Sequence, residues 1–142
     1  MRVLLDANIF ISYLLPSSIS IPIRLILRGA IEGKYTLLIS DPLVTEFSRK
    51  ISTKPYLRGR IAQEALTLFI SLLRTVSEQI SPIIEEIPKA VRDPNDNYLV
   101  AYALIGQADY LVTGDNDLLS LQQIGTLTIL RPSEFAALLA ET

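Results

Sequence analysis

The chain has 142 residues, a formal net charge of −2 and 49% hydrophobic residues. This size and composition predict one globular domain over residues 1–142 and exclude a disordered or low-complexity chain. Cysteine and histidine are both absent, which excludes disulfide frameworks, thiol chemistry, histidine catalysis and the usual zinc sites. Any catalysis would therefore depend on carboxylates, hydroxyls, amides, Lys and Arg.

Strand-like and helix-like segments alternate along the chain. The first half predicts a strand over 2–5, a short helix over 9–15, a helix from Ser20 to Gly33, a strand over 35–39 and a helix opening at Ser40-Asp41-Pro42. In that last helix we expect Asp41 as N-cap and Pro42 as the first helical residue. A long amphipathic helix is predicted over 61–76. An ambiguous apolar run over 80–84, broken by Pro82, follows it and leaves open a short edge element.

The second half continues the same alternation. It predicts a helix capped at Asp93-Pro94, a strand over 109–112, a short helix over 118–121, a strand over 126–130 and a closing helix from Pro132. This order is typical of an α/β domain with a parallel sheet. No apolar run approaches the length of a membrane span, and Asp6 interrupts the first one too early for a signal peptide. We therefore expect a cytoplasmic protein without membrane contact.

Four acidic residues, Asp6, Glu46, Asp96 and Asp115, follow strand-like runs or lie in the first turns of helices. Because the carboxyl ends of parallel strands meet at the edge where α/β folds bind ligands, we expect these carboxylates to converge. Two carboxylates ~4 Å apart repel by roughly 4 kcal/mol at an effective dielectric of about 20. Such a cluster needs a cation or raised pKa values, and oxygen ligands alone select hard cations such as Mg²⁺, Mn²⁺ or Ca²⁺.

Each acid also has a purely structural interpretation. Asp6 and Asp115 could cap the helices that follow them, Asp96 could favour a helix N-terminus, and Glu46 could lie on a solvated helix face. Taken together, the four favour a metal site. We assign Asp117 as an outer ligand and Asn8, Thr113 and Asn97 as neutral or supporting contacts.

Four segments carry a family resemblance: LLDAN (4–8), LVTEF (43–47), DPNDNYLVAYA (93–103) and DYLVTGDNDLL (109–119). In this order they resemble PIN-domain nucleases, and more narrowly the stand-alone PIN proteins that serve as toxins of prokaryotic type II toxin–antitoxin pairs. The segment Val-Thr-Gly-Asp-x-Asp (112–117) is the most specific of them.

The resemblance implies a PIN-like three-layer fold, with a central, mostly parallel, twisted sheet of about four to five strands flanked by helices. It implies an endoribonuclease whose Asp6, Glu46, Asp96 and Asp115 are catalytic and bind one or two Mg²⁺ or Mn²⁺ ions, with Asp117 as a fifth metal ligand. It also implies an RNA substrate, an antitoxin partner and a homodimer. The chain differs most from the family in the basic stretch after Glu46.

That basic stretch lies between residues 49 and 60 and contains no acid. Its cations are Arg49, Lys50, Lys54, Arg58 and Arg60, which we assign to the backbone of bound RNA. The alternative is a solvated loop whose charges aid solubility. Residues 19–31 carry more apolar side chains than one buried face requires, which leaves open a partner surface or deep burial.

Two other functions fit parts of the pattern. A non-catalytic PIN-like scaffold would bind RNA or protein without cutting it. A haloacid-dehalogenase-type phosphatase also places an Asp after the first strand, but it needs a second acid where this chain has Asn8 and a Lys near the later acids, and no Lys follows Lys89. A response-regulator receiver fails for similar reasons.

Overall fold

The computed structural model describes residues 1–16, 19–82 and 94–141, and the side chains of these residues except 94–97. Asp93, predicted as a helix N-cap, lies outside the described residues. Asp96 and Asn97 are placed by their backbone only.

The strands form one sheet in the order β3-β2-β1-β4-β6-β5. Their bounds are β1 (Arg2–Leu5), β2 (Thr36–Ile39), β3 (Ser77–Gln79), β4 (Tyr110–Val112), β5 (Gln123–Ile124) and β6 (Leu127–Leu130). Every pairing is parallel except that of β5 with β6. Strand β1 lies between β2 and β4, and its residues Val3 to Leu5 are fully buried.

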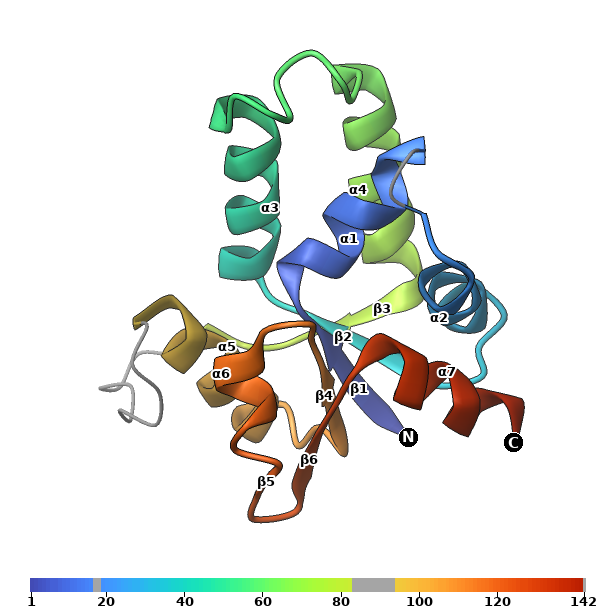
Figure 1. The fold of residues 1–142 in the computed structure, drawn as a ribbon, viewed down its shortest axis with the longest axis vertical. Helices are drawn as coiled ribbons and strands as arrows, with labels where there is room; N and C mark the ends of the chain where they lie inside the picture. Colours follow the sequence, from blue (N-terminus) through green and yellow to red (C-terminus); the bar gives the residue numbers. More distant parts are fainter. Residues whose placement is uncertain (17–18, 83–93, 142) are drawn as a thin grey trace.

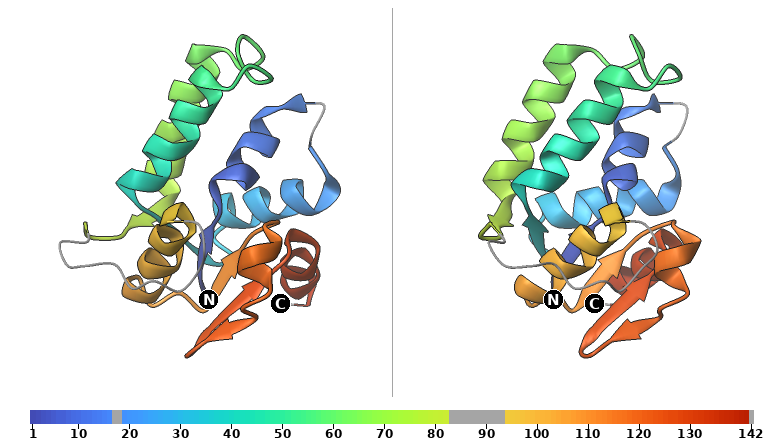
Figure 2. Two further views of the ribbon diagram at one scale, coloured as in Figure 1. Left: turned by 60° about the vertical axis from the view of Figure 1, so that its left-hand side comes forward. Right: turned by 90° about the vertical axis from the view of Figure 1, so that its left-hand side faces the viewer.

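The described helices are α1 (Ala7–Leu14), α2 (Ile21–Ile31), α3 (Asp41–Thr53), α4 (Gln63–Val76), α5 (Pro94–Ile105), α6 (Asn116–Leu119) and α7 (Pro132–Ala140). Helices α2 and α7 pack together on one side of the sheet and α5 lies on the other, which gives three layers (Figures 1 and 2). None of the described helices has both the length and the apolar composition that a membrane crossing requires.

The predicted α/β three-layer fold is confirmed, and the described sheet has six strands rather than about four to five. The two short edge strands account for the difference. Strand β3 consists of Ser77, Glu78 and Gln79, and β5 has only two residues, so neither shows an apolar run. Both pair through backbone hydrogen bonds, which the side-chain pattern does not reveal.

The predicted cap of α3 is wrong by one residue. Ser40, not Asp41, is the N-cap: it has extended backbone angles, and its hydroxyl accepts a hydrogen bond of 3.3 Å from the Leu43 N–H. Asp41 and Pro42 are therefore the first two helical residues. Ser40 can cap the helix because the parallel strand β2 ends at Ile39, directly before it.

Helix α5 runs antiparallel to the strands. The Arg2 guanidinium, at the amino end of β1, donates hydrogen bonds of 3.0 and 2.8 Å to the Gly106 carbonyl, just past the end of α5. The chain then turns directly into β4. Because α5 has 12 residues and rises by about 1.5 Å per residue, its first turn, which bears Asp96, lies toward the opposite, carboxyl-end edge of the sheet.

A buried tyrosine, Tyr35, lies directly before β2 and contacts both α2 and α7. These contacts can be tested. The Tyr35 hydroxyl donates a 2.7 Å hydrogen bond to the Ile26 carbonyl, and the ring packs edge-to-face on Phe135 of α7. We expect Tyr35→Phe to lower the free energy of unfolding by about 0.5–1.5 kcal/mol at pH 7, because a buried hydrogen bond is lost while the Ile26 carbonyl stays within the hydrogen-bonded turns of α2. Urea unfolding measures this change, and exposed Tyr56→Phe is the matched control.

The difference in unfolding free energy between the wild type and Tyr35→Phe should change with pH in one direction. Burial raises the pKa of Tyr35 well above its ordinary value near 10. Above about pH 10 the unfolded chain therefore loses the Tyr35 proton while the folded chain keeps it, which lowers the stability of the wild type. The stability gap between wild type and Tyr35→Phe should narrow above pH 10; a constant gap would contradict this assignment.

Candidate functional site

Apart from tyrosines, the buried polar side chains of the described residues all lie at one edge of the sheet. They are Asp6, Ser40 and Thr113, with 7%, 2% and 0% of their surface exposed. Each directly follows a strand, β1, β2 or β4, and these three strands are neighbours in parallel register. The carboxyl ends of the central strands thus form a polar edge above an apolar core.

Asp6 is held at this edge by its neighbour strand. Its N–H donates to the Val112 carbonyl at 2.9 Å, and its Oδ2 accepts a 2.6 Å hydrogen bond from the Thr113 hydroxyl. Asp6 occupies the N-cap position of α1, yet its side chain makes no capping hydrogen bond. Its Oδ1 has no hydrogen-bond donor in the part of the chain that the structure describes. A buried carboxylate with one satisfied oxygen is suited to bind a cation with the other.

Asp115 is connected to Asp6 through the same threonine. The Asp115 N–H donates to Thr113 Oγ1 at 3.0 Å, so Thr113 accepts from one acidic residue and donates to the other. Asp115 Oδ1 accepts from the Asp117 N–H at 2.8 Å and caps the short helix α6. The capping interpretation of Asp115 therefore holds for one of its oxygens. Asp117 is half-buried and Asn8 is exposed.

Glu46 lies in the second turn of α3, where it forms an ion pair with Lys50 at 3.3 Å. About a quarter of each side chain is exposed, 28% for Glu46 and 25% for Lys50. Lys50 is four residues on, the spacing that brings two side chains together on one helix face. Glu46 is thus neutralised by its own helix.

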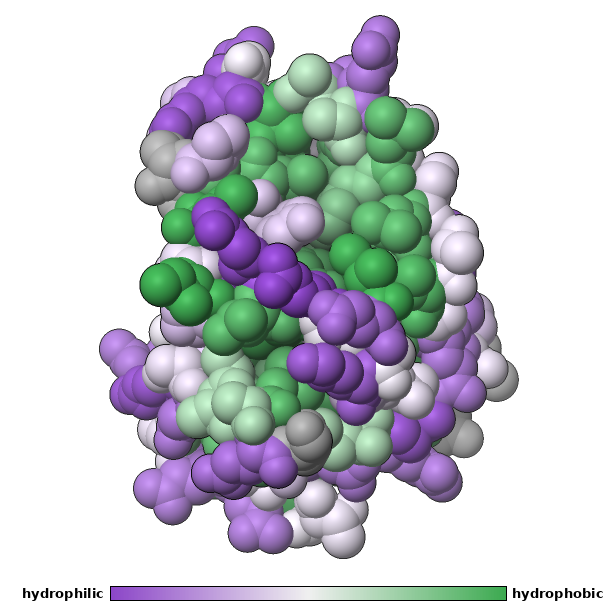
Figure 3. All heavy atoms as spheres, turned by 90° about the vertical axis from the view of Figure 1, so that its right-hand side faces the viewer, coloured by the Kyte–Doolittle hydropathy of each residue, from purple (hydrophilic) through white to green (hydrophobic). Residues whose placement is uncertain are grey.

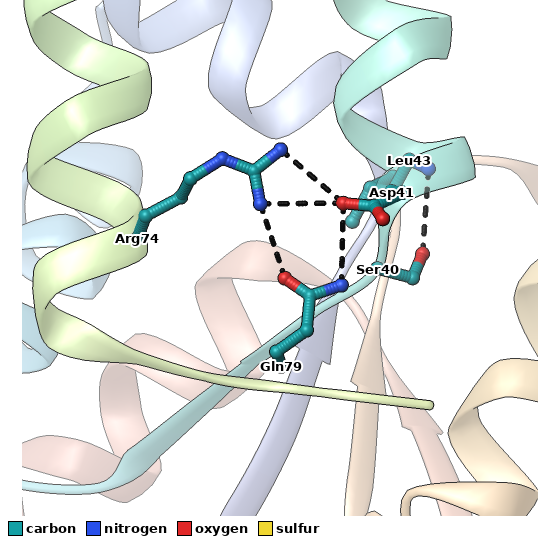
Figure 4. A network of polar contacts seen from close by, with 5 residues as sticks. All are labelled: Ser40, Asp41, Leu43, Arg74 and Gln79. Carbon is teal, nitrogen blue, oxygen red and sulfur yellow. Dashed lines mark hydrogen bonds and ion pairs between the residues drawn. The ribbon is translucent and has the colours of Figure 1, made fainter. Parts of the chain in front are cut away.

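A polar network fixes the start of α3 (Figure 4). Asp41 Oδ1 accepts hydrogen bonds from both terminal nitrogens of Arg74 at 3.2 Å and from Gln79 Nε2 at 3.4 Å. Arg74 lies in the last turn of α4 and Gln79 ends β3, so three elements meet at the first residue of α3. This network and the Ser40 cap together hold α3, and with it Glu46, relative to the sheet.

Among the described side chains, no three acidic residues gather into a metal-binding group. Asp6 and Asp115 are joined through Thr113, whereas Glu46 is paired with Lys50. The Asp96 and Asn97 side chains lie outside the described part of the chain, although their backbone belongs to the first turn of α5. The donors at this edge are all oxygens, which fit Mg²⁺ or Mn²⁺ better than softer metals.

A groove of about 490 Å³ lies between α3 and α5, next to this edge. Its α3 side includes Ser40, Glu46 and Arg49, and its α5 side is formed by Tyr98, Leu99 and Tyr102. We did not predict the α5 residues from the sequence. The spacing of Tyr98 and Tyr102, one helical turn apart, was the available signal, but it is equally typical of a buried helix face.

The cations of the basic stretch lie in two places. Arg49 lines the groove and Lys50 pairs with Glu46, both within α3. Lys54, Arg58 and Arg60 belong to the connection between α3 and α4, which lies at the end of the helix pair away from the sheet (Figure 1). All except Lys50 are exposed.

Apolar side chains spread over much of the face that bears α2 and α4 (Figure 3). On α2, Ile21 is 73% exposed and Leu25 is 40% exposed, whereas Ile26 is fully buried. On α4, Leu68 is 72% exposed. The apolar excess of residues 19–31 is therefore divided between the core and the surface.

Comparisons with known proteins agree with this fold. Among solved structures, the crystal structure of VapBC2 from Rickettsia felis bound to a DNA fragment from their promoter is similar, with a TM-score of 0.59 and 16% sequence identity over 92% of this chain and 98% of that chain. At this identity the likeness shows a shared fold alone. A search of curated proteins gave no match. A family model described as PIN domain matches residues 2–117, which include Asp6, Glu46, Asp96 and Asp115. The chain therefore belongs to the PIN domain family.

Proposed function

We propose that this protein is a metal-dependent endoribonuclease that hydrolyses RNA phosphodiester bonds and serves as the toxin of a toxin–antitoxin pair. The observation that carries the proposal is the buried Asp6 carboxylate, which Thr113 orients at the carboxyl edge of the sheet in a PIN-domain chain. A buried acid with one oxygen that accepts a hydrogen bond from no described residue is well suited to bind a cation.

Asp6, Asp96 and Asp115 would hold one Mg²⁺ or Mn²⁺ ion, with Asp117 as an outer ligand. When bound, such an ion supplies Lewis-acid polarisation of a phosphoryl oxygen and lowers the pKa of a water molecule. Glu46 would hold a second ion or orient the attacking water. The chain has no histidine, so no imidazole takes part in proton transfer.

The other residues of the site position these groups. Thr113 keeps the Asp6 carboxylate in one orientation and ties the Asp115 backbone to it. Lys50 balances the charge of Glu46 and would contact a substrate phosphate. Arg49 extends the cationic surface along α3, and Lys54, Arg58 and Arg60 would contact the RNA backbone farther from the cleaved bond.

The partners proposed for this chain are an antitoxin protein and a second copy of itself. The exposed apolar residues of α2 and α4 include Ile21 and Leu68. Monomeric proteins rarely expose large apolar surfaces to water, so these residues are candidates for a partner interface. The similar fold of VapBC2, crystallised with a promoter DNA fragment, gives the antitoxin further support. An RNA substrate would be met in the cytoplasm.

Cleavage of a labelled mixed RNA tests the activity directly. We expect cleavage by the purified protein with Mn²⁺ or Mg²⁺, and none with a chelator. Asp6→Asn and Asp96→Asn should each reduce cleavage to the level of the chelator control while leaving the fold intact, because each removes a charged ligand and relieves carboxylate repulsion.

Metal-induced thermal stabilisation separates a nuclease from a non-catalytic scaffold. A metal at 100 times its Kd should stabilise the wild type by about 2.7 kcal/mol, and Asp6→Asn should lose most of this gain. Full metal-dependent cleavage by Asp6→Asn or Asp96→Asn would contradict the assignment. A protein with neither cleavage nor a metal-induced shift would be a scaffold.

Thr113 is a positioning residue whose role can be separated from that of the acids. Thr113→Val keeps the side-chain shape but removes the hydroxyl that orients Asp6, so we expect a loss of metal affinity of about 10- to 100-fold. Thr113→Ser, which retains the hydroxyl, should recover most of that affinity. Mn²⁺ titration of both variants measures the difference, and equal affinities would show that the hydroxyl does not position the ligand.

A further inference from the structure

The groove between α3 and α5 has a composition that the acidic site does not explain. Apolar and aromatic groups, including Leu99 and Tyr102, form much of its lining, and its volume of about 490 Å³ is within the ~300–1,000 Å³ typical of small-ligand sites. Tyr98 is 48% exposed at the groove and makes no aromatic contact with another described ring. An aromatic ring is thus available to a planar ligand.

The groove also joins the acidic site to Arg49, a cation with no ion pair among the described residues. Glu46 belongs both to the groove lining and to the proposed catalytic acids. Arg49 follows it by three residues, about 4.5 Å along the helix axis, and makes no ion pair with any other described residue. A ligand in the groove would therefore have an aromatic face, a guanidinium and the cleavage site within reach.

We propose that this groove binds one unstacked nucleobase of the RNA strand, next to the cleaved bond. The Tyr98 ring stacks on the base, and the Arg49 guanidinium contacts an adjacent phosphate. Stacking on an aromatic side chain is tolerant of sequence because every base has a π-face, and a guanidinium contacts phosphate through charge-assisted hydrogen bonds. The inference rests on the proposed function and adds a base-binding residue outside the acidic site.

The test measures binding rather than cleavage. Short labelled single-stranded RNAs are titrated with the protein in the presence of chelator, and fluorescence anisotropy gives the Kd. One RNA is intact, and the others each have an abasic ribose at a single position. We expect wild-type protein to lose about 5- to 150-fold in affinity when one particular base is removed.

The variants assign that loss to the groove. Tyr98→Ala should bind intact RNA about 5- to 150-fold more weakly and become indifferent to base removal, whereas Tyr98→Phe should bind like the wild type. Ile105→Ala is the matched control, since Ile105 is on the same helix, is 52% exposed and does not line the groove. Arg49→Ala should weaken binding to all the RNAs alike and reduce the salt slope by about one, unlike the control Arg24→Ala on α2.

Each contrary outcome has one meaning. No effect of base removal at any position, wild-type affinity in Tyr98→Ala, or no binding of RNA at all would overturn the groove assignment. Base-dependent binding without metal-dependent cleavage would overturn the proposed nuclease but keep the groove. Metal-dependent cleavage without base-dependent binding would overturn the groove assignment but keep the proposed nuclease.

Discussion

The buried carboxylate of Asp6 is the constraint on which the rest of the site depends. A carboxylate with 7% of its surface exposed is costly unless hydrogen bonds or a cation stabilise its charge. The protein supplies one strong hydrogen bond, from Thr113 on the adjacent strand, and leaves the other oxygen unused within the described residues. This arrangement requires β1 and β4 to be parallel neighbours, so the sheet topology and the acidic site depend on each other.

The same topology produces the groove. Helix α3 starts at the end of β2 and is held there by the Ser40 cap and the Asp41 network, so Glu46 and Arg49 extend away from the sheet edge. Helix α5 approaches β4 from the opposite direction, which brings its first turns beside α3. Acids at the strand ends and an aromatic groove between the two helices would together bind a phosphodiester and a neighbouring base.

The sequence predicted the apolar strands and the polar edge at their carboxyl ends, where Asp6 and Thr113 lie, because buried parallel strands are continuous apolar runs followed by polar turns. It did not predict β3 and β5, whose polar residues pair through the backbone. Asp41 was mistaken for the cap because Ser and Asp are equally good N-cap residues and only the end of β2 decides between them.

Tyr98 was missed because one-turn aromatic spacing does not distinguish a groove from a core. Thr113 was predicted as a supporting contact from its place after β4. The Glu46–Lys50 ion pair was not predicted, although the two residues are four apart on one helix, the spacing at which opposite charges meet.

The most direct test of the central claim is to locate the metal. Crystals of the protein grown with Mn²⁺ would give an anomalous difference map that shows each ion without reference to activity. The proposed site predicts a peak within bonding distance of the Asp6 and Asp115 carboxylates, at the carboxyl edge of β1 and β4, with Asp96 completing its ligands. A fully occupied ion elsewhere, with the Asp6 carboxylate contacting only Thr113, would contradict the account.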